Sequence, residues 1–294
     1  MQENGKLIII GGAEDKQGEC QILKEVAKAA GTPQGRIVII TTATQKPREA
    51  GKLYVKLFKD LGVEGVEVIN IESRQDAGQQ TFLRTVEKAT CIFFTGGDQL
   101  RITSILGGTA MGDKLKQLYY SGITIAGTSA GASAMSSTMI ITGNEEDSPK
   151  KCTVKMAPGL DLLKGCVIDQ HFAQRGRIGR LLCAVAQNPH VLGIGIDEDT
   201  AIVVEGNRFR VAGSQAVTVV DGRLLSFSNV SETKPDDPLA LMGIVLHVLP
   251  KGYGFDLANK KPINYQFWED RNEDTGKGNI QRQEYIQSQY GNKD

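Results

Sequence analysis

Short apolar runs alternate with longer amphipathic segments through the first half of the chain. The runs are rich in Ile, Val and Phe, which is typical of strands that are covered on both faces. In the segments between them, apolar residues recur at intervals of three and four, which predicts helices. We expect strands over 6–10, 36–41, 66–71, 91–94 and 123–126, and helices over 21–30, 48–61, 81–89 and 111–120. This alternation predicts an α/β fold of flavodoxin-like type, with a mostly parallel sheet and helices on both faces.

The second half of the chain has a less regular pattern. Its apolar runs predict strands over 167–169, 192–196, 215–220 and 243–249, a hairpin over 201–212 and a helix over 178–186. We expect residues 139–156 to form a long polar excursion. Beyond about Tyr265 the chain turns polar and rich in Gln, Asn and charge. The pattern therefore predicts one α/β catalytic domain over 1–264 and a polar C-terminal extension over 265–294.

Composition excludes several classes of protein. Lys and Arg number 34 and Asp and Glu also number 34, so the formal net charge is zero. This balance argues against a protein whose whole face binds nucleic acid or an acidic membrane. No apolar run reaches the roughly 18 residues of a membrane span, and the N-terminus lacks the pattern of a signal peptide. The five cysteines are dispersed without a CxxC pair, so we expect reduced thiols, a cytoplasmic protein and no metal site.

The strongest candidate for chemistry is a G-x-S-x-G motif, Gly127-Thr128-Ser129-Ala130-Gly131. An apolar strand precedes it and a helical start of small residues follows. A nucleophile elbow requires this setting, because a tight strand-to-helix turn holds the serine hydroxyl above the edge of the sheet. The backbone N–H of Ala130 would then begin a helix, where it can stabilise an oxyanion. An ordinary glycine-rich turn is the competing interpretation.

A serine nucleophile needs a base and an acid that orients the base. Of the three histidines, His171 alone follows the carboxyl end of a strand, while His190 lies in a turn and His247 within an apolar strand. The acid is expected in Asp197-Glu198-Asp199 at the end of another strand, and spacing cannot choose among the three. The chain order of serine, histidine and acid differs from that of the α/β-hydrolases and indicates another fold family.

Three arginines follow the candidate base, Arg175, Arg177 and Arg180, at the start of an amphipathic helix. Cations at a helix N-terminus oppose the helix dipole and need an explanation. They can form a pocket for a substrate carboxylate, or they can pair with Asp169 and nearby acids.

Two Gly-Gly turns also end strands, Gly11-Gly12 and Gly96-Gly97. Glycine at such a place lets the backbone approach a ligand closely. We expect an N–H of Gly97 or Asp98 to complete the oxyanion hole and Gln99 to face the substrate. Neither turn carries a dinucleotide or P-loop fingerprint, so no cofactor is expected.

Five segments together resemble the cyanophycinases, which belong to a serine peptidase family that also contains aspartyl dipeptidase. The segments occur in family order: GGAEDK (11–16), FTGGDQ (94–99), GTSAGAS (127–133), DQHFAQRGRIGRL (169–181) and GIGIDEDTA (193–201). The resemblance implies a fold related to class I glutamine amidotransferases, with serine in place of their cysteine, and a homodimer. It assigns the nucleophile to Ser129, the base to His171 and the orienting acid to Glu198. It places substrate-binding residues at Gln99, Asp169, Gln170, Arg175, Arg177 and Arg180.

The resemblance also implies a substrate. Cyanophycin is a poly-aspartate chain with arginine linked to each side-chain carboxyl group, and cyanophycinases release β-Asp-Arg dipeptides from it. This polymer would offer carboxylates to the arginines and guanidinium groups to acids such as Asp169. The alternatives are a dipeptidase acting on N-terminal Asp peptides and a non-catalytic flavodoxin-like binding module. A glutamine amidotransferase is disfavoured, because the elbow residue is Ser129.

Overall fold

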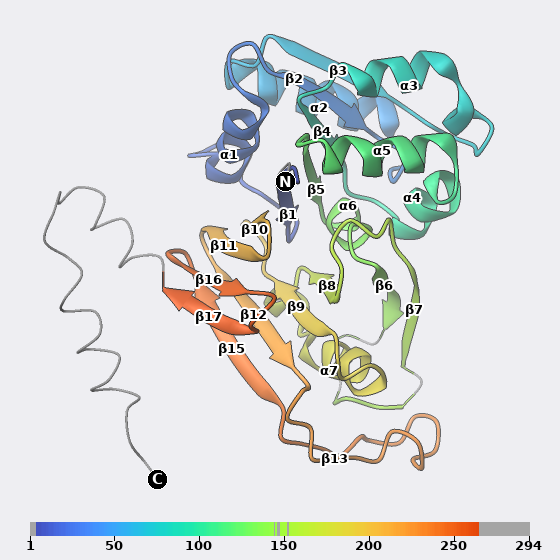
Figure 1. The fold of residues 1–294 in the computed structure, drawn as a ribbon, viewed down its shortest axis with the longest axis vertical. Helices are drawn as coiled ribbons and strands as arrows, with labels where there is room; N and C mark the ends of the chain where they lie inside the picture. Colours follow the sequence, from blue (N-terminus) through green and yellow to red (C-terminus); the bar gives the residue numbers. More distant parts are fainter. Residues whose placement is uncertain (1–3, 144, 146–147, 152, 265–294) are drawn as a thin grey trace, which may run out of the picture.

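The computed structural model describes residues 4–143, 145, 148–151 and 153–264 of the chain (Figure 1). Its largest element is a nine-stranded sheet with the order β17-β16-β11-β10-β1-β5-β4-β2-β3. The five strands from β1 to β3 in this order pair in parallel: β1 (Leu7–Ile10), β5 (Thr124–Thr128), β4 (Cys91–Phe94), β2 (Arg36–Ile40) and β3 (Gly65–Ile69). The other four pair antiparallel: β10 (Thr200–Glu205), β11 (Arg208–Gly213), β16 (Tyr253–Asp256) and β17 (Lys261–Asn264).

Helices cover both faces of the parallel strands. Side chains alternate between the faces of a strand, so Ile8 and Ile10 face one way while Leu7 and Ile9 face the other. The face with Ile8 and Ile10 packs against α1 (Gln21–Ala30) and α2 (Pro47–Asp60). The opposite face packs against α3 (Gln80–Glu87), α4 (Gln99–Leu106), α5 (Ala110–Tyr120) and α6 (Ala130–Ser133). The carboxyl ends of the parallel strands remain as an edge where loops can carry chemistry.

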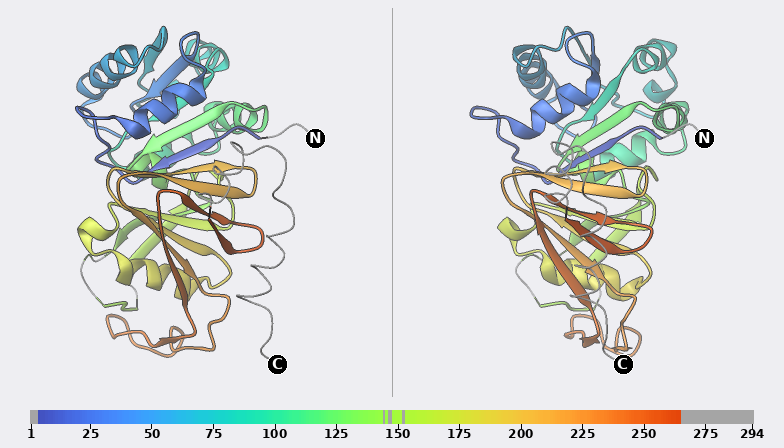
Figure 2. Two further views of the ribbon diagram at one scale, coloured as in Figure 1. Left: turned by 90° about the vertical axis from the view of Figure 1, so that its left-hand side faces the viewer. Right: turned by 60° about the vertical axis from the view of Figure 1, so that its left-hand side comes forward.

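A second sheet of four strands has the order β15-β12-β9-β8 (Figure 2). Its strands are β8 (Cys166–Gln170), β9 (Leu192–Ile196), β12 (Ala216–Asp221) and β15 (Val245–Pro250), and α7 (Ile178–Gln187) packs on one face. Two short pairs complete the fold, β6 (Thr138–Gly143) with β7 (Val154–Pro158) and β13 (Phe227–Ser228) with β14 (Leu241–Met242). Ile168 and Ile194 of the second sheet share one buried cluster with Leu7 and Ile125 of the first, so the two sheets enclose a common core.

The α/β fold expected from the sequence is confirmed, and each predicted element of the first half is present within two residues of its expected limits. The late strands β8 and β9 belong to the second, four-stranded sheet and not to the sheet that contains the parallel strands of the first half. The expectation for residues 139–156 was wrong, because β6 and β7 pair there and bury Met139 and Ile140 completely. The proposed extension over 265–294 lies outside the described residues. In the described part of the chain, no helix is long and apolar enough to cross a membrane.

Candidate active site

Ser129 occupies a strained turn between β5 and α6. Its backbone φ of 52° lies in a region that L-residues disfavour, and its N–H donates to the Ile10 carbonyl at 3.0 Å. A Cβ at Gly127 would lie 2.7 Å from the Gly131 carbonyl, and a Cβ at Gly131 would lie 2.7 Å from Cβ of Phe94. Both glycines of the motif are therefore required by close packing. The chain folds here as a nucleophile elbow needs, with the serine at its tip.

His171 reaches Ser129 from the end of β8. The distance from Ser129 Oγ to His171 Nε2 is 3.0 Å. The backbone N–H of His171 donates to the Gly11 carbonyl at 2.8 Å, which ties the end of the second sheet to the end of β1. Elements from both sheets thus bring together the two residues that the sequence suggested for nucleophile and base.

Glu198 lies behind the imidazole, with 2.6 Å between its Oε1 and His171 Nδ1. A carboxylate only accepts hydrogen bonds, so Nδ1 carries the proton and Nε2 is free to accept from the serine hydroxyl. The two neighbouring acids have other partners. Asp197 accepts from the Ala173 N–H at 3.0 Å, and Asp199 accepts from the Asp15 N–H at 2.8 Å. Of the three acids that the spacing in the sequence left open, the structure therefore places Glu198 against His171.

The surroundings of His171 favour its neutral form. Burial lowers the pKa of the imidazole below its ordinary value, and the positive charges of Arg175 and Arg177 lower the pKa further. The hydrogen bond that His171 Nδ1 donates to Glu198 acts in the opposite direction and raises the pKa. The ring is consequently ready to accept a proton at neutral pH, as a general base must be.

The Gly96-Gly97 turn lies beside the serine. A Cβ at Gly96 would be 3.4 Å from Cβ of Ser129 and 3.9 Å from its Oγ. Asp98, however, was a wrong choice as an oxyanion donor, because its N–H donates to the Ala43 carbonyl at 3.0 Å. Its carboxylate accepts from the Leu100 N–H and caps α4. Gly97 and Ala130 remain the predicted donors.

The arginines that follow His171 pair with acids of this chain. Arg180 forms a forked ion pair with Asp169, whose carboxylate is fully buried and accepts from Arg180 Nε at 2.7 Å and from Nη2. Burial raises the pKa of Asp169, while Arg180 acts to lower it. Because Arg180 engages both oxygens, Asp169 supports the arginines rather than presenting a free acceptor to a substrate guanidinium.

Arg177 is also buried, and it joins the end of β8 to a loop. Its Nη1 donates to the Gln170 carbonyl at 2.6 Å and to Gln170 Oε1 at 3.1 Å, and its Nε donates to Glu145 Oε1 at 3.1 Å. The more exposed Arg175 lies 3.6 Å from the same Glu145 oxygen. No motif in the sequence indicated Glu145. Its exposed carboxylate occupies the position at which two arginines could receive a carboxylate from a substrate.

A family model described as peptidase family S51 matches residues 7–212. The chain belongs to peptidase family S51. It is 38% identical to a cyanophycinase of Geminocystis herdmanii over 87% of this chain and 95% of that protein. It is 37% identical to a cyanophycinase of Synechococcus elongatus over 86% of this chain and 79% of that protein. A peptidase from an acI-B1 actinobacterium, 20% identical, shares the fold with a TM-score of 0.63 over 87% of this chain and 98% of that chain.

The resemblance to this peptidase family is thereby confirmed, and the chain is a peptidase and hence a hydrolase.

Gln99 has fewer groups free to contact a substrate in the candidate site than expected. Its Nε2 donates to the carbonyls of Ile140 at 2.8 Å and Ile141 at 3.1 Å, so both amide hydrogens bind β6. Only its carbonyl oxygen remains for a substrate, and that oxygen suits a cationic group.

Two further residues of this S51 peptidase contact the base and the acid, and the sequence did not indicate either contact. Gly12 lies against the His171 ring, so that a Cβ there would be 2.3 Å from Cε1. Gln174 accepts from the Glu198 backbone N–H at 2.9 Å and helps to fix the acid. The Gly11-Gly12 pair predicts a close approach of the backbone to another group, but no pattern in the sequence indicates that this group is His171.

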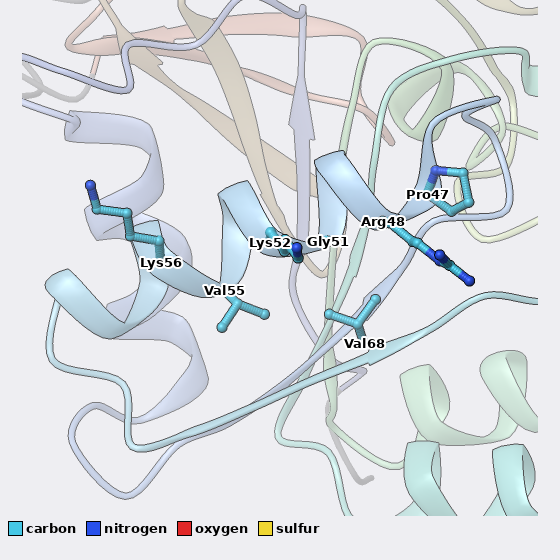
Figure 3. A pocket seen from close by; sticks show the side chains of 7 residues that line it. All are labelled: Pro47, Arg48, Gly51, Lys52, Val55, Lys56 and Val68. Carbon is cyan, nitrogen blue, oxygen red and sulfur yellow. The ribbon is translucent and has the colours of Figure 1, made fainter.

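A groove of about 400 Å³ lies elsewhere on the molecule, between α2 and β3 (Figure 3). Val55 and Val68 form apolar parts of its wall, with Arg48, Lys52 and Lys56 along α2. It contains none of the residues that surround Ser129. Among the described residues, no group of three or more His, Cys, Asp or Glu side chains could hold a metal ion.

Proposed function

We propose that this S51 peptidase hydrolyses the poly-aspartate backbone of cyanophycin to β-Asp-Arg dipeptides through an acyl-enzyme on Ser129. The observation that carries the proposal is the chain of hydrogen bonds from Ser129 through His171 to Glu198. The choice of substrate is supported by relatives named cyanophycinase that match most of this chain. It is supported too by Arg175 and Arg177, whose charges act on His171, since cyanophycin carries carboxylates along its length.

In the first step, His171 Nε2 takes the proton from Ser129 Oγ while the oxygen attacks a backbone carbonyl carbon of the substrate. Glu198 stabilises the imidazolium that forms. The carbonyl oxygen becomes negative and is stabilised by the N–H groups of Ala130 and Gly97. The C–N bond then breaks, and the proton on His171 moves to the leaving amine.

In the second step, His171 takes a proton from water, and the resulting hydroxide attacks the ester carbon on Ser129. The C–O bond to Ser129 breaks, and His171 returns the proton to Oγ. The product leaves with a free carboxyl group. The two steps together consume one water molecule for each peptide bond and restore the enzyme.

The decisive experiment is mass spectrometry of the products after incubation with cyanophycin. We expect β-Asp-Arg to accumulate. Cleavage of short N-terminal Asp peptides without release of β-Asp-Arg would contradict the proposal and identify the chain as a dipeptidase. Absence of hydrolysis with either substrate would contradict both the proposed substrate and the proposed dipeptidase alternative.

The pH dependence of kcat/KM is expected to follow His171. Activity should rise with pH through the imidazole pKa and then level off, because the protonated ring cannot accept the serine proton. The midpoint should lie below the ordinary histidine value of about 6.5, since burial lowers this pKa. Arg175→Gln removes a positive charge and should move the midpoint upward, measurably at low ionic strength. Arg210→Gln, at a distant ion pair with Glu25, should leave it unchanged.

Arg177→Lys is expected to lower kcat/KM for cyanophycin by about tenfold or more, because lysine cannot replace a forked donor at a buried site. Steady-state kinetics with the polymer measures the loss. Arg208→Lys is the matched control, since Arg208 pairs with Asp256 at a more exposed position. Equal kcat/KM in wild type and Arg177→Lys would exclude this arginine from substrate recognition.

The proposal includes a cytoplasmic homodimer. A reducing compartment agrees with Cys20, Cys91, Cys166 and Cys183, which are free cysteines. Light scattering in solution should give a mass twice the 31.8 kDa of one chain. A mass of one chain at micromolar concentration would contradict the dimer without affecting the proposed chemistry.

A further inference from the structure

A buried carboxylate that the proposed mechanism does not use lies directly behind the elbow. The side chain of Glu14, in the loop after β1, is only 1% exposed. Its Oε1 accepts from the Tyr54 hydroxyl, and its Oε2 accepts from Thr128 Oγ1 at 2.6 Å. Lys16 Nζ lies 2.9 Å from Oε1. A buried carboxylate without partners would be strongly destabilising, and here two hydroxyl donors and one cation offset that cost.

The partners of Glu14 connect it to rigid parts of the fold. Tyr54 comes from α2, where its ring packs 4.7 Å from that of Phe93 in β4. Burial and the charge of Glu14 both raise the pKa of Tyr54, so the phenol stays protonated and donates. Lys16 also donates to the Glu14 carbonyl at 3.1 Å. The carboxylate is therefore fixed in place through Oε1, the oxygen that does not bind Thr128.

Thr128 connects the fixed carboxylate of Glu14 to the nucleophile. It is the last residue of β5 and immediately precedes Ser129, whose φ of 52° is disfavoured. A residue held in such a conformation needs surrounding contacts to keep it there. The hydrogen bond from Thr128 to a charged acceptor is a strong contact of this kind.

The loop after β1, which contains Glu14, also contacts the segments that carry His171 and Glu198. The Gly11 carbonyl accepts from the His171 N–H at 2.8 Å, and the Gly12 carbonyl accepts from the Asp199 N–H at 2.9 Å. One short segment thus contacts the residue before the nucleophile, the base itself and the residue after the orienting acid. The loop is placed to set the separation between Ser129 and His171.

We propose that Glu14 is a positioning residue, which holds the Ser129 elbow in register with His171 by accepting a hydrogen bond from Thr128. The inference rests on the proposed function, because it takes Ser129 to be the nucleophile. Its effect is on turnover: a loosened elbow misplaces Oγ in every bound complex but leaves the surfaces that bind the substrate unchanged.

Thr128→Val and Thr128→Ser form a matched pair for the test. Valine keeps the shape of threonine and loses the hydroxyl, so kcat should fall about tenfold or more, as expected for loss of a hydrogen bond to a charged group. KM should change less than about twofold. Serine keeps the hydroxyl and should recover most of kcat. If Thr128 acted through packing alone, Thr128→Ser would have the lower kcat of the two variants, because serine loses the methyl group that valine keeps.

Glu14→Gln should behave like Thr128→Val, since an amide has one accepting oxygen where the site needs two. Asp221→Asn is the control, because Asp221 is a buried carboxylate that pairs with Arg223 at the end of β12, outside the site. It should retain kcat even if its melting temperature falls as much as that of Glu14→Gln. Wild-type kcat in both Glu14→Gln and Thr128→Val would overturn the proposal.

Crystal structures of the variants separate this inference from the proposed function. We expect the distance from Ser129 Oγ to His171 Nε2, 3.0 Å in the wild type, to lengthen in Thr128→Val and to be retained in Thr128→Ser. If the wild type releases no dipeptide, the proposed function fails, and this distance still decides whether Glu14 positions the elbow. An unchanged distance in Thr128→Val and Glu14→Gln contradicts the positioning role.

Discussion

Ser129→Ala is expected to reduce the release of β-Asp-Arg from cyanophycin by about 10⁴-fold or more, with the fold retained. The substitution removes the atom that would attack the substrate and leaves His171 without a proton to accept. What remains is the contribution of the oxyanion donors and of substrate binding, which is small beside that of an intact nucleophile, base and acid. Quantitative mass spectrometry of the dipeptide measures the loss, and thermal unfolding reports on the fold.

Ser133→Ala is the matched control for this variant. Ser133 lies in the same short helix that follows the elbow and is 1% exposed, with its Oγ 3.5 Å from the Ile168 carbonyl. Its replacement should leave turnover within about twofold of the wild type, because its hydroxyl contacts the Ile168 carbonyl and takes no part in the proposed proton transfer. Dipeptide release by Ser129→Ala at a rate comparable with that of Ser133→Ala would remove Ser129 from the mechanism.

The parts of the fold that the sequence predicted are those governed by local periodicity. The helix over 21–30 and the strands over 91–94 and 192–196 have the limits expected, because each pattern reflects which faces of a single element are buried. Residues 139–156 were misjudged, since their polar character conceals a pair of strands with a register shift between Ile140 and Thr142. An irregular pair exposes and buries residues without a fixed period, so no alternation indicated it.

In the candidate site, the sequence could predict only those residues that a local pattern within one element indicates. Ser129 stands in a motif and His171 stands at the end of an apolar run, so both could be chosen from the sequence. Glu198 could not be distinguished from its neighbours, because the direction of its side chain depends on how β9 meets the loop after β8. The pairing of Asp169 with Arg180 fixes which groups remain for a substrate, and it depends on contacts that no spacing encodes.

Gly12→Ala is expected to reduce kcat about 100-fold or more, although Gly12 takes no part in the chemistry. A Cβ at this position would lie 2.3 Å from Cε1 and 2.5 Å from Nε2 of His171, which is far inside van der Waals contact. The imidazole would have to move by about 1 Å, and a displacement of this size at a catalytic group can reduce a rate about 100-fold. Steady-state kinetics measures the loss, and a crystal structure of the variant would show the displaced ring.

Gly31→Ala separates this clash from the strain of the backbone. Gly12 and Gly31 have φ values of +100° and +87°, but a Cβ at Gly31, at the end of α1, would meet nothing within 4 Å. Both variants should lose about 1–2 kcal/mol of unfolding free energy, because an L-residue is strained at such a φ. Only Gly12→Ala should lose turnover, since only there does the new methyl group meet the base. Equal kcat in the two variants would contradict this prediction, because it would show that the new methyl group does not displace His171 from its working position.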